Sequence, residues 1–98
     1  MTADNYYIYM LTNRNNKMIY VGMINDRERK IYENQNNFLK DFIKSYKVNK
    51  LVYYETAEDI GKAIEREKEI KEFNREKKNK LVETINPTWI DLMDRLIK

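Results

Sequence analysis

The sequence predicts an α+β domain, with a three-stranded antiparallel β-sheet flanked by helices. Two segments near the start, Tyr7–Tyr9 and Ile19–Gly22, alternate and are rich in aromatic and β-branched residues, as strands are. A third segment of this kind covers residues 51–55. Most of the later sequence has apolar residues at helical spacing. Strands therefore come first and helices mostly afterwards.

The first two strands are expected to form a hairpin around a turn at Thr12–Lys17. A loop centred between Arg14 and Asn15 places Tyr9 directly opposite Tyr20, with their Cβ atoms about 5 Å apart. Two neighbouring phenols can be a core pair or can present two hydroxyls to a substrate, and the hairpin alone leaves both open. Gly22 indicates a bulge or a close approach of chain or ligand.

Helical segments are expected around the third strand. The predicted segments are 25–34, 38–43, 56–73, a segment from there to about Ile85, and 89–96. Thr56–Asp59 has capping-box spacing, so it is expected to open the long helix. Asn86–Pro87 is expected to end the next helix, because the residue before a proline is disfavoured in the α region. The last helix is expected to pack back through Trp89, Leu92 and Leu96.

Length and composition limit the chemistry that is available. A chain of 98 residues predicts one domain, covering residues 1–98. It has no cysteine and no histidine, which excludes thiolate sites and removes the usual general base and zinc ligand. Catalysis would use Tyr, Lys, Arg, Asp or Glu, with a hard ion such as Mg²⁺ bound through carboxylate. Without a signal-peptide pattern or a long apolar run, we expect a cytoplasmic protein with no membrane partner.

One carboxylate interrupts the apolar side of the long helix. At about 100° per residue, the apolar positions 60, 63, 64 and 70 form one stripe, and Glu67 falls within it. A carboxylate aimed toward a sheet is costly unless it is paired, hydrogen-bonded or bound to a cation. Glu67 is therefore a candidate cation ligand. The alternative is that it sits at the open end of the stripe and pairs with a nearby lysine.

Residues 71–80 are locally basic in a chain whose net charge is +3. Such a segment is more often a solvated helix face than a surface that contacts phosphates. Both interpretations remain open at this point.

With these residues in place, the chain resembles the GIY-YIG nuclease family, especially its small single-domain bacterial members. Tyr7–Tyr9 stands where the GIY element falls, with Tyr7 in place of its glycine, and Tyr20–Gly22 stands at the YIG element. Further matches are the 51–55 segment, Arg66–Glu67 and 86–89, so the resemblance runs from about Tyr6 to Leu96.

The resemblance implies hydrolysis of DNA phosphodiesters with a single divalent ion, Mg²⁺ or Mn²⁺. Tyr9 and Tyr20 become the paired site tyrosines, and Tyr20, or a water that it polarises, helps to deprotonate the nucleophile. Glu67 becomes the metal ligand, and Asn86 orients the site near the scissile phosphate. DNA is the expected partner.

Two candidate catalytic positions depart from the family pattern. Lys30 stands where the pattern places an arginine that clamps the phosphate, and Asn34 stands where many members have a histidine. Lysine loses the planar fork that matches a phosphate, and asparagine cannot shuttle a proton. Losing one electrostatic contact to a transition state costs about 10²–10³-fold in rate.

The sequence therefore predicts a metal-dependent DNA endonuclease of reduced activity. The alternative is an inactive domain of the same fold that binds nucleic acid or a protein partner. A third hypothesis is a redesigned scaffold whose site was never selected for activity.

Overall fold

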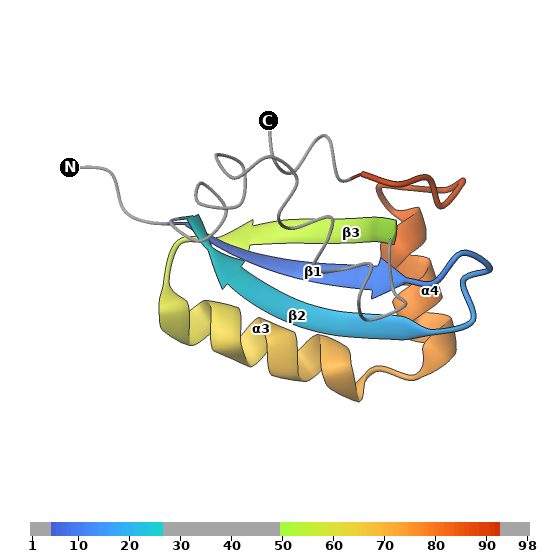
Figure 1. Cartoon of the computed structure of the whole chain (residues 1–98). Helices are drawn as coiled ribbons and strands as arrows, with labels where there is room; N and C mark the ends of the chain where they lie inside the picture. The colour runs from blue at the N-terminus through green and yellow to red at the C-terminus, as the bar shows by residue number, and fades with distance from the viewer. Residues whose placement is uncertain (1–4, 27–49, 93–98) are drawn as a thin grey trace.

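The computed structural model describes residues 5–26 and 50–92. The elements are β1 (Tyr6–Thr12), β2 (Ile19–Asn25), β3 (Lys50–Ala57), α3 (Ile60–Glu72) and α4 (Arg75–Glu83). β1 lies in the centre of a three-stranded sheet of order β2-β1-β3, antiparallel to both neighbours (Figure 1). The predicted α+β class and antiparallel sheet are confirmed.

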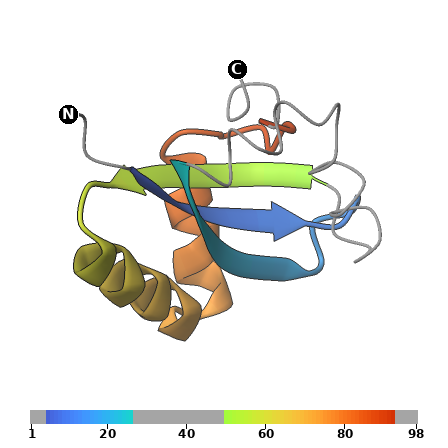
Figure 2. The same ribbon diagram turned by 60° about the vertical axis from the view of Figure 1, so that its left-hand side comes forward.

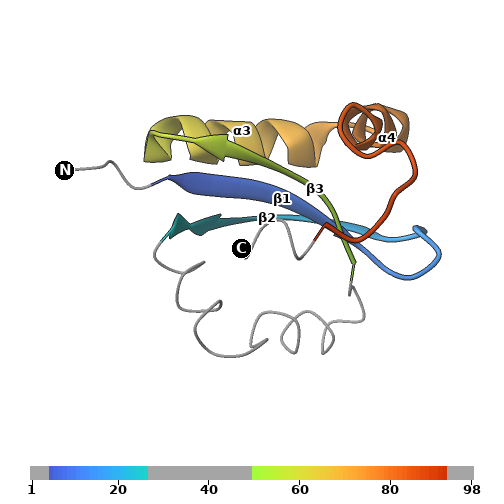
Figure 3. The ribbon, with the colours of Figure 1, turned by 90° about the horizontal axis from the view of Figure 1, so that it is seen from above.

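Both described helices cover the same face of the sheet. Seen from above, α3 lies lengthwise along this face while α4 is viewed end-on, so the helices point in different directions (Figure 3). Figure 2 shows the same layer from a second side. Ile8 and Met10 of β1 are fully buried here with Val21 of β2, and they pack against Ala63 and Ile70 of α3. This face therefore carries the core.

The opposite face carries Tyr9 and Tyr20. Successive side chains of a strand point to opposite faces, so Tyr9 lies on the face away from Ile8 and Met10. Tyr9 pairs with Gly22, and Leu11 pairs with Tyr20, which puts Tyr20 on that same face. The tyrosines are thus kept out of the helix-covered core.

The predicted hairpin register is wrong by two residues, since Tyr9 lies opposite Gly22 and not Tyr20. The loop explains the difference. The Asn16 N–H donates to the Asn13 carbonyl at 3.0 Å, and Asn16 takes a left-handed φ of 60°, which asparagine tolerates. The Asn13 side chain then accepts from the Met18 N–H at 3.0 Å, so pairing resumes only at Ile19. The turn therefore lies later in the chain than predicted.

The long helix begins later than the capping-box pattern predicts. Thr56 and Ala57 still belong to β3, because they pair with Tyr7 and Tyr6. Asp59 is the N-cap, and its side chain accepts from the Gly61 N–H at 2.8 Å. The end near Phe73 is confirmed, since Phe73 is the C-cap. Pairing with β1 thus keeps Thr56 and Ala57 in the strand, although their spacing fits a capping box.

The apolar stripe is narrower than its spacing predicts. Ala63 and Ile70 are buried, but Ile60 and Ile64 are 52% and 50% exposed. The core cluster takes in only the line of α3 that contains the two buried residues. Ile60 and Ile64 therefore lie at the half-exposed margins of the stripe.

The predicted helix from Trp89 is wrong over residues 89–92, which are not helical. Trp89 takes a φ of 57°, outside the right-handed helical region. The Leu92 N–H donates to the Leu51 carbonyl at 2.7 Å, so this segment runs along the edge of β3. Leu92 is buried and Trp89 is partly buried against the core, as expected for packing residues. Residues 93–96 lie outside the described residues.

The predicted helical segments 25–34 and 38–43 lie almost entirely outside the described residues. Among the described helices, none is long and apolar enough to cross a membrane.

Candidate active site

Gly22 is required by the position of the Tyr9 ring. A Cβ added at Gly22 would lie 2.5 Å from Tyr9 Cζ and would be at least as close to the hydroxyl, nearer than real Cβ contacts come. The Tyr9 side chain therefore lies across β2, over its cross-strand partner. The close approach expected at Gly22 is confirmed, and it is made by Tyr9.

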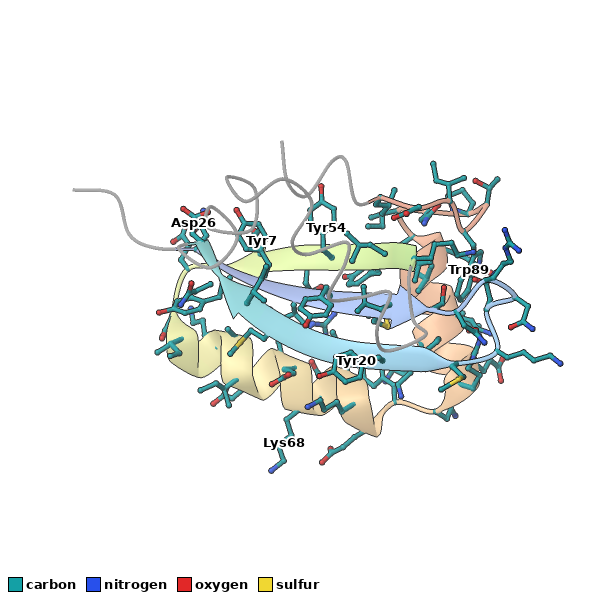
Figure 4. The ribbon with its side chains drawn as sticks, viewed as in Figure 1. Tyr7, Tyr20, Asp26, Tyr54, Lys68 and Trp89 are labelled. Atoms are coloured by element: carbon teal, nitrogen blue, oxygen red, sulfur yellow. The ribbon has the colours of Figure 1, made fainter. Side chains whose placement is uncertain are left out.

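Tyr9 and Tyr20 are diagonal neighbours on the same face. Their ring centroids are 6.4 Å apart and the rings are tilted by 36°, a separation at which aromatic rings interact. Tyr20 is 53% exposed. Figure 4 shows it at the free edge of β2, on the side toward α3. The pair is thus packed on one side and open to solvent on the other.

Tyr7 lies on the same face as Tyr9, two residues earlier on β1. Its hydroxyl donates to Asp26 Oδ1 at 3.2 Å, at the end of β2 (Figure 4). This contact links the far ends of the two hairpin strands. The tyrosine that stands in place of the first motif glycine therefore has its own structural partner.

Glu67 lies on the β2 side of α3. Residues 66 and 67 are about 100° apart around a helix, so they flank the buried line through Ala63 and Ile70 on opposite sides. Arg66 reaches Glu55 of β3, with Nε 2.5 Å from Oε1. Glu67 therefore points the other way, toward the edge strand that carries Tyr20 and Gly22.

Glu67 also has an ion-pair partner. Lys71 Nζ lies 3.4 Å from Glu67 Oε2, and the Glu67 side chain is 21% exposed. This is the lysine contact that the alternative interpretation expected. Such exposed helix pairs contribute only about 0.3–0.5 kcal/mol, so the contact does not prevent the carboxylate from binding a cation.

The donor set fits one kind of metal site. No group of three or more metal-ligating acidic, His or Cys side chains occurs in residues 5–26 and 50–92. Mg²⁺ commonly keeps several waters and is held by one or two carboxylates and substrate phosphates. A single accessible carboxylate such as Glu67 suits that arrangement and not a closed protein cage.

The side chain of Asn86 is committed to the backbone. Asn86 is only 2% exposed, and its Nδ2 donates to the carbonyls of Val52 at 3.0 Å and Ile90 at 2.8 Å. Its Oδ1 accepts from the Ile90 N–H at 3.0 Å. Asn86 thus fixes the turn after α4 against β3. Its contribution near a scissile phosphate stays a prediction.

Comparison with known proteins identifies the family. The model of the GIY-YIG catalytic domain matches residues 5–81, which include Tyr9, Tyr20 and Glu67. The chain belongs to the GIY-YIG family. A relative is UPF0213 protein SSP2268 of Staphylococcus saprophyticus subsp. saprophyticus, 34% identical over 79 residues, covering 81% of this chain and 95% of the relative. No solved structure matches the chain.

Two candidate residues of the GIY-YIG pattern, Lys30 and Asn34, lie outside the described residues. Their roles stay predictions from the sequence.

On the side of α3 that faces β3 lies an ionic network that the sequence did not predict. The Arg66 guanidinium makes a second contact with the Glu55 carboxylate, with Nη2 3.3 Å from Oε2. Its Nη1 lies 2.6 Å from Glu69 Oε1. Tyr53 donates its hydroxyl to the same Glu55 carboxylate. The hydrogen bond with Glu55 is the largest cause that raises the pKa of Arg66. The sequence did offer a signal for this network: Arg66 lies next to the buried line of α3, and the predicted third strand ends with the acidic residue Glu55.

The β1–β2 hairpin of this GIY-YIG domain is also anchored to α4. Arg75 Nη1 donates to the Lys17 carbonyl at 2.9 Å, and Nη2 donates to the Asn16 carbonyl. Nothing in the spacing of the sequence indicates this contact between distant segments. It holds the turn that leads directly into Tyr20.

Proposed function

We propose that this GIY-YIG domain is a DNA endonuclease that hydrolyses phosphodiesters with one divalent ion, Mg²⁺ or Mn²⁺, held by Glu67. The observation that carries the proposal is the edge of β2. The ring centroids of Tyr9 and Tyr20 are 6.4 Å apart there, and helical geometry places Glu67 on the side of α3 that is turned toward β2. Family membership supports a nuclease, and nucleases of this family generally use divalent metal ions.

The chain's own residues would position and activate the nucleophile. A water attacks phosphorus and the bond from phosphorus to the leaving oxygen breaks. The water's proton passes to solvent through the Tyr20 hydroxyl or a water bound to it, and the leaving oxygen takes up a proton from solvent to become a hydroxyl. The bound ion would supply positive charge to the phosphate oxygens in the transition state. Tyr9, fixed across Gly22, holds the neighbouring ring of Tyr20 in place.

The first test is cleavage of labelled plasmid and branched DNA with Mn²⁺. Glu67→Gln should abolish cleavage because it removes the carboxylate ligand while keeping the side-chain shape. Glu65→Gln is the matched control, since Glu65 is an exposed carboxylate on the same helix and should keep wild-type activity. Equal cleavage by Glu67→Gln and wild type would remove Glu67 from the site.

A second candidate function is an inactive GIY-YIG domain that retains nucleic-acid binding. The observation that favours it is the pair of departures at Lys30 and Asn34. If these two residues alone weaken the site, Lys30→Arg with Asn34→His should raise cleavage at least tenfold, since an arginine fork matches a phosphate. The measurement is the single-turnover rate with Mn²⁺. An unchanged rate would contradict a repairable site and favour the inactive domain.

A further inference from the structure

We propose that the β1–β2 loop and one side of α4 form a surface that binds the phosphate backbone of DNA next to the tyrosine pair. The identity of the nucleic acid rests on the proposed function. We call this the loop–α4 surface and define it by the side chains of Arg14, Lys17, Arg75 and Lys78.

Arg75 brings these basic residues together. Its guanidinium donates to the Asn16 and Lys17 carbonyls, so the loop is fixed at the start of α4. Figure 1 shows the loop and α4 at the same end of the molecule. Lys78 lies three residues after Arg75, so both lie on the same side of the helix. Segments nearly sixty positions apart thus share one surface.

The positive charge of this surface is not cancelled within the part of the chain that the structure describes. The described carboxylates form no ion pair with Arg14, Lys17 or Lys78. The donors of Arg75 go to neutral carbonyl and amide oxygens, including Asn79 Oδ1 at 2.9 Å. Such uncancelled charge is what attracts a phosphate backbone.

Three other lysines of the basic segment have partners of their own, and for Lys77 the partner is the Phe73 ring, whose centroid lies 4.2 Å from its Nζ. Lys71 pairs with Glu67, and Lys80 Nζ lies 3.5 Å from Glu76 Oε1. The segment is therefore neither uniformly basic nor uniformly neutralised. The structure singles out the side that meets the loop.

The loop is held in a defined shape before any ligand binds. Thr12 Oγ1 donates to Asn16 Oδ1 at 3.0 Å, and the Lys17 N–H donates to Asn15 Oδ1 at 3.2 Å. A preordered loop loses less conformational entropy on binding than a flexible one. Arg14 and Lys17 are exposed on this frame.

The spacing to the site suits a single DNA strand. Tyr20 follows Lys17 by three residues, which span at most about 10 Å at ~3.3 Å per residue. One strand of B-DNA carries a phosphate every ~3.4 Å of helix axis. The loop would therefore hold the backbone within about three nucleotides of the phosphate at Tyr20. Binding at this distance positions the strand without occupying the site.

The test measures DNA affinity against salt concentration in a Glu67→Gln background, so that substrate is not consumed. Fluorescence anisotropy with duplex DNA compares Arg14→Gln/Lys17→Gln with the control Lys62→Gln/Lys68→Gln. Glu67→Gln raises the formal net charge from +3 to +4, and both pairs lower it from there to +2, since each removes two positive charges. Lys62 and Lys68 are exposed on α3, and Lys68 points away from the sheet (Figure 4).

The loop pair should weaken binding at least tenfold and reduce the slope of log K against log salt by about 2, one for each lost phosphate contact. The α3 pair should leave the slope close to that of the parent. Equal effects of the two pairs, or no salt-dependent binding by the parent, would overturn the proposal. Equal affinity for polyglutamate of matched charge would also overturn it, because the attraction would then be general.

Failure of this surface and failure of the nuclease are separable. Wild-type protein that cleaves DNA while the loop pair leaves the slope unchanged would retain the nuclease and remove the surface. A slope change in the loop pair, together with no cleavage by wild type, would retain the surface and remove the nuclease. Circular dichroism of each variant checks that these exposed substitutions leave the fold intact.

Discussion

At the scale of single residues, the close contact between the Tyr9 ring and Gly22 fixes the position of a tyrosine of the proposed site on the sheet. Gly22→Ala should destabilise the protein by about 1–3 kcal/mol, because its Cβ overlaps the Tyr9 ring and forces the ring to move. Cleavage should fall with it, since the ring of Tyr9 supports Tyr20. Urea unfolding and the cleavage assay measure the two effects.

Gly61→Ala is the matched control for this substitution. Its Cβ would meet Asp59 Oδ1 at 3.4 Å, an ordinary contact, and the site lies at the start of α3. We expect stabilisation of about 0.4–1 kcal/mol, the opposite sign.

In a double-mutant cycle, Tyr9→Ala should remove most of the cost of Gly22→Ala. Strictly additive losses would contradict the overlap.

At the scale of elements, Arg75 connects α4 to the β1–β2 loop. Arg75→Ala removes the donors to the Asn16 and Lys17 carbonyls, so we expect a loss of about 1–2 kcal/mol and faster opening of the loop. The sensitive measurement is hydrogen exchange of the Met18 amide, which bonds to Asn13. Lys80→Ala, which breaks only an exposed ion pair, is the control. Unchanged protection at Met18 in Arg75→Ala would show that the loop holds its shape alone.

At the scale of the whole molecule, the hydrogen bonds around Glu55 make the free energy of unfolding vary with pH in the alkaline range. Burial, followed by the hydrogen bond to Glu55, raises the pKa of Tyr53 well above its ordinary value of 10.0. The folded state then keeps a proton that the unfolded chain loses. The stabilisation is complete below pH 10 and declines above it, by up to about 1.4 kcal/mol per pH unit.

Tyr53→Phe should therefore show a shallower loss of stability between pH 9 and pH 11, while being about 1 kcal/mol less stable near neutrality through the lost hydrogen bond. Urea unfolding across this pH range measures the slope. Tyr20→Phe, which removes a half-exposed phenol, is the matched control. Identical slopes in the two variants would contradict the role of Tyr53.

The sequence predicted those features of the molecule that arise from local patterns. Alternation located the strands, and the apolar spacing with one misplaced carboxylate located α3 and Glu67. Features set by distant contacts were missed. Asn86, Asp91 and Leu92 bond to the backbone of β3, and these contacts take the place of the predicted helix over residues 89–92. The hairpin register depended on side-chain bonds within an asparagine-rich turn, which periodicity does not reveal.

The central position of β1 also sets the order in which the strands can pair during translation. The hairpin of β1 and β2 needs only nearby residues, so the two phenols can meet early in synthesis. The other edge of β1 stays unpaired until β3 has been translated, and an unpaired edge is open to wrong pairing. The Glu67 carboxylate arrives later still, on α3. A ribosome-bound chain that stops before α3 therefore carries the two tyrosines of the proposed site without its carboxylate.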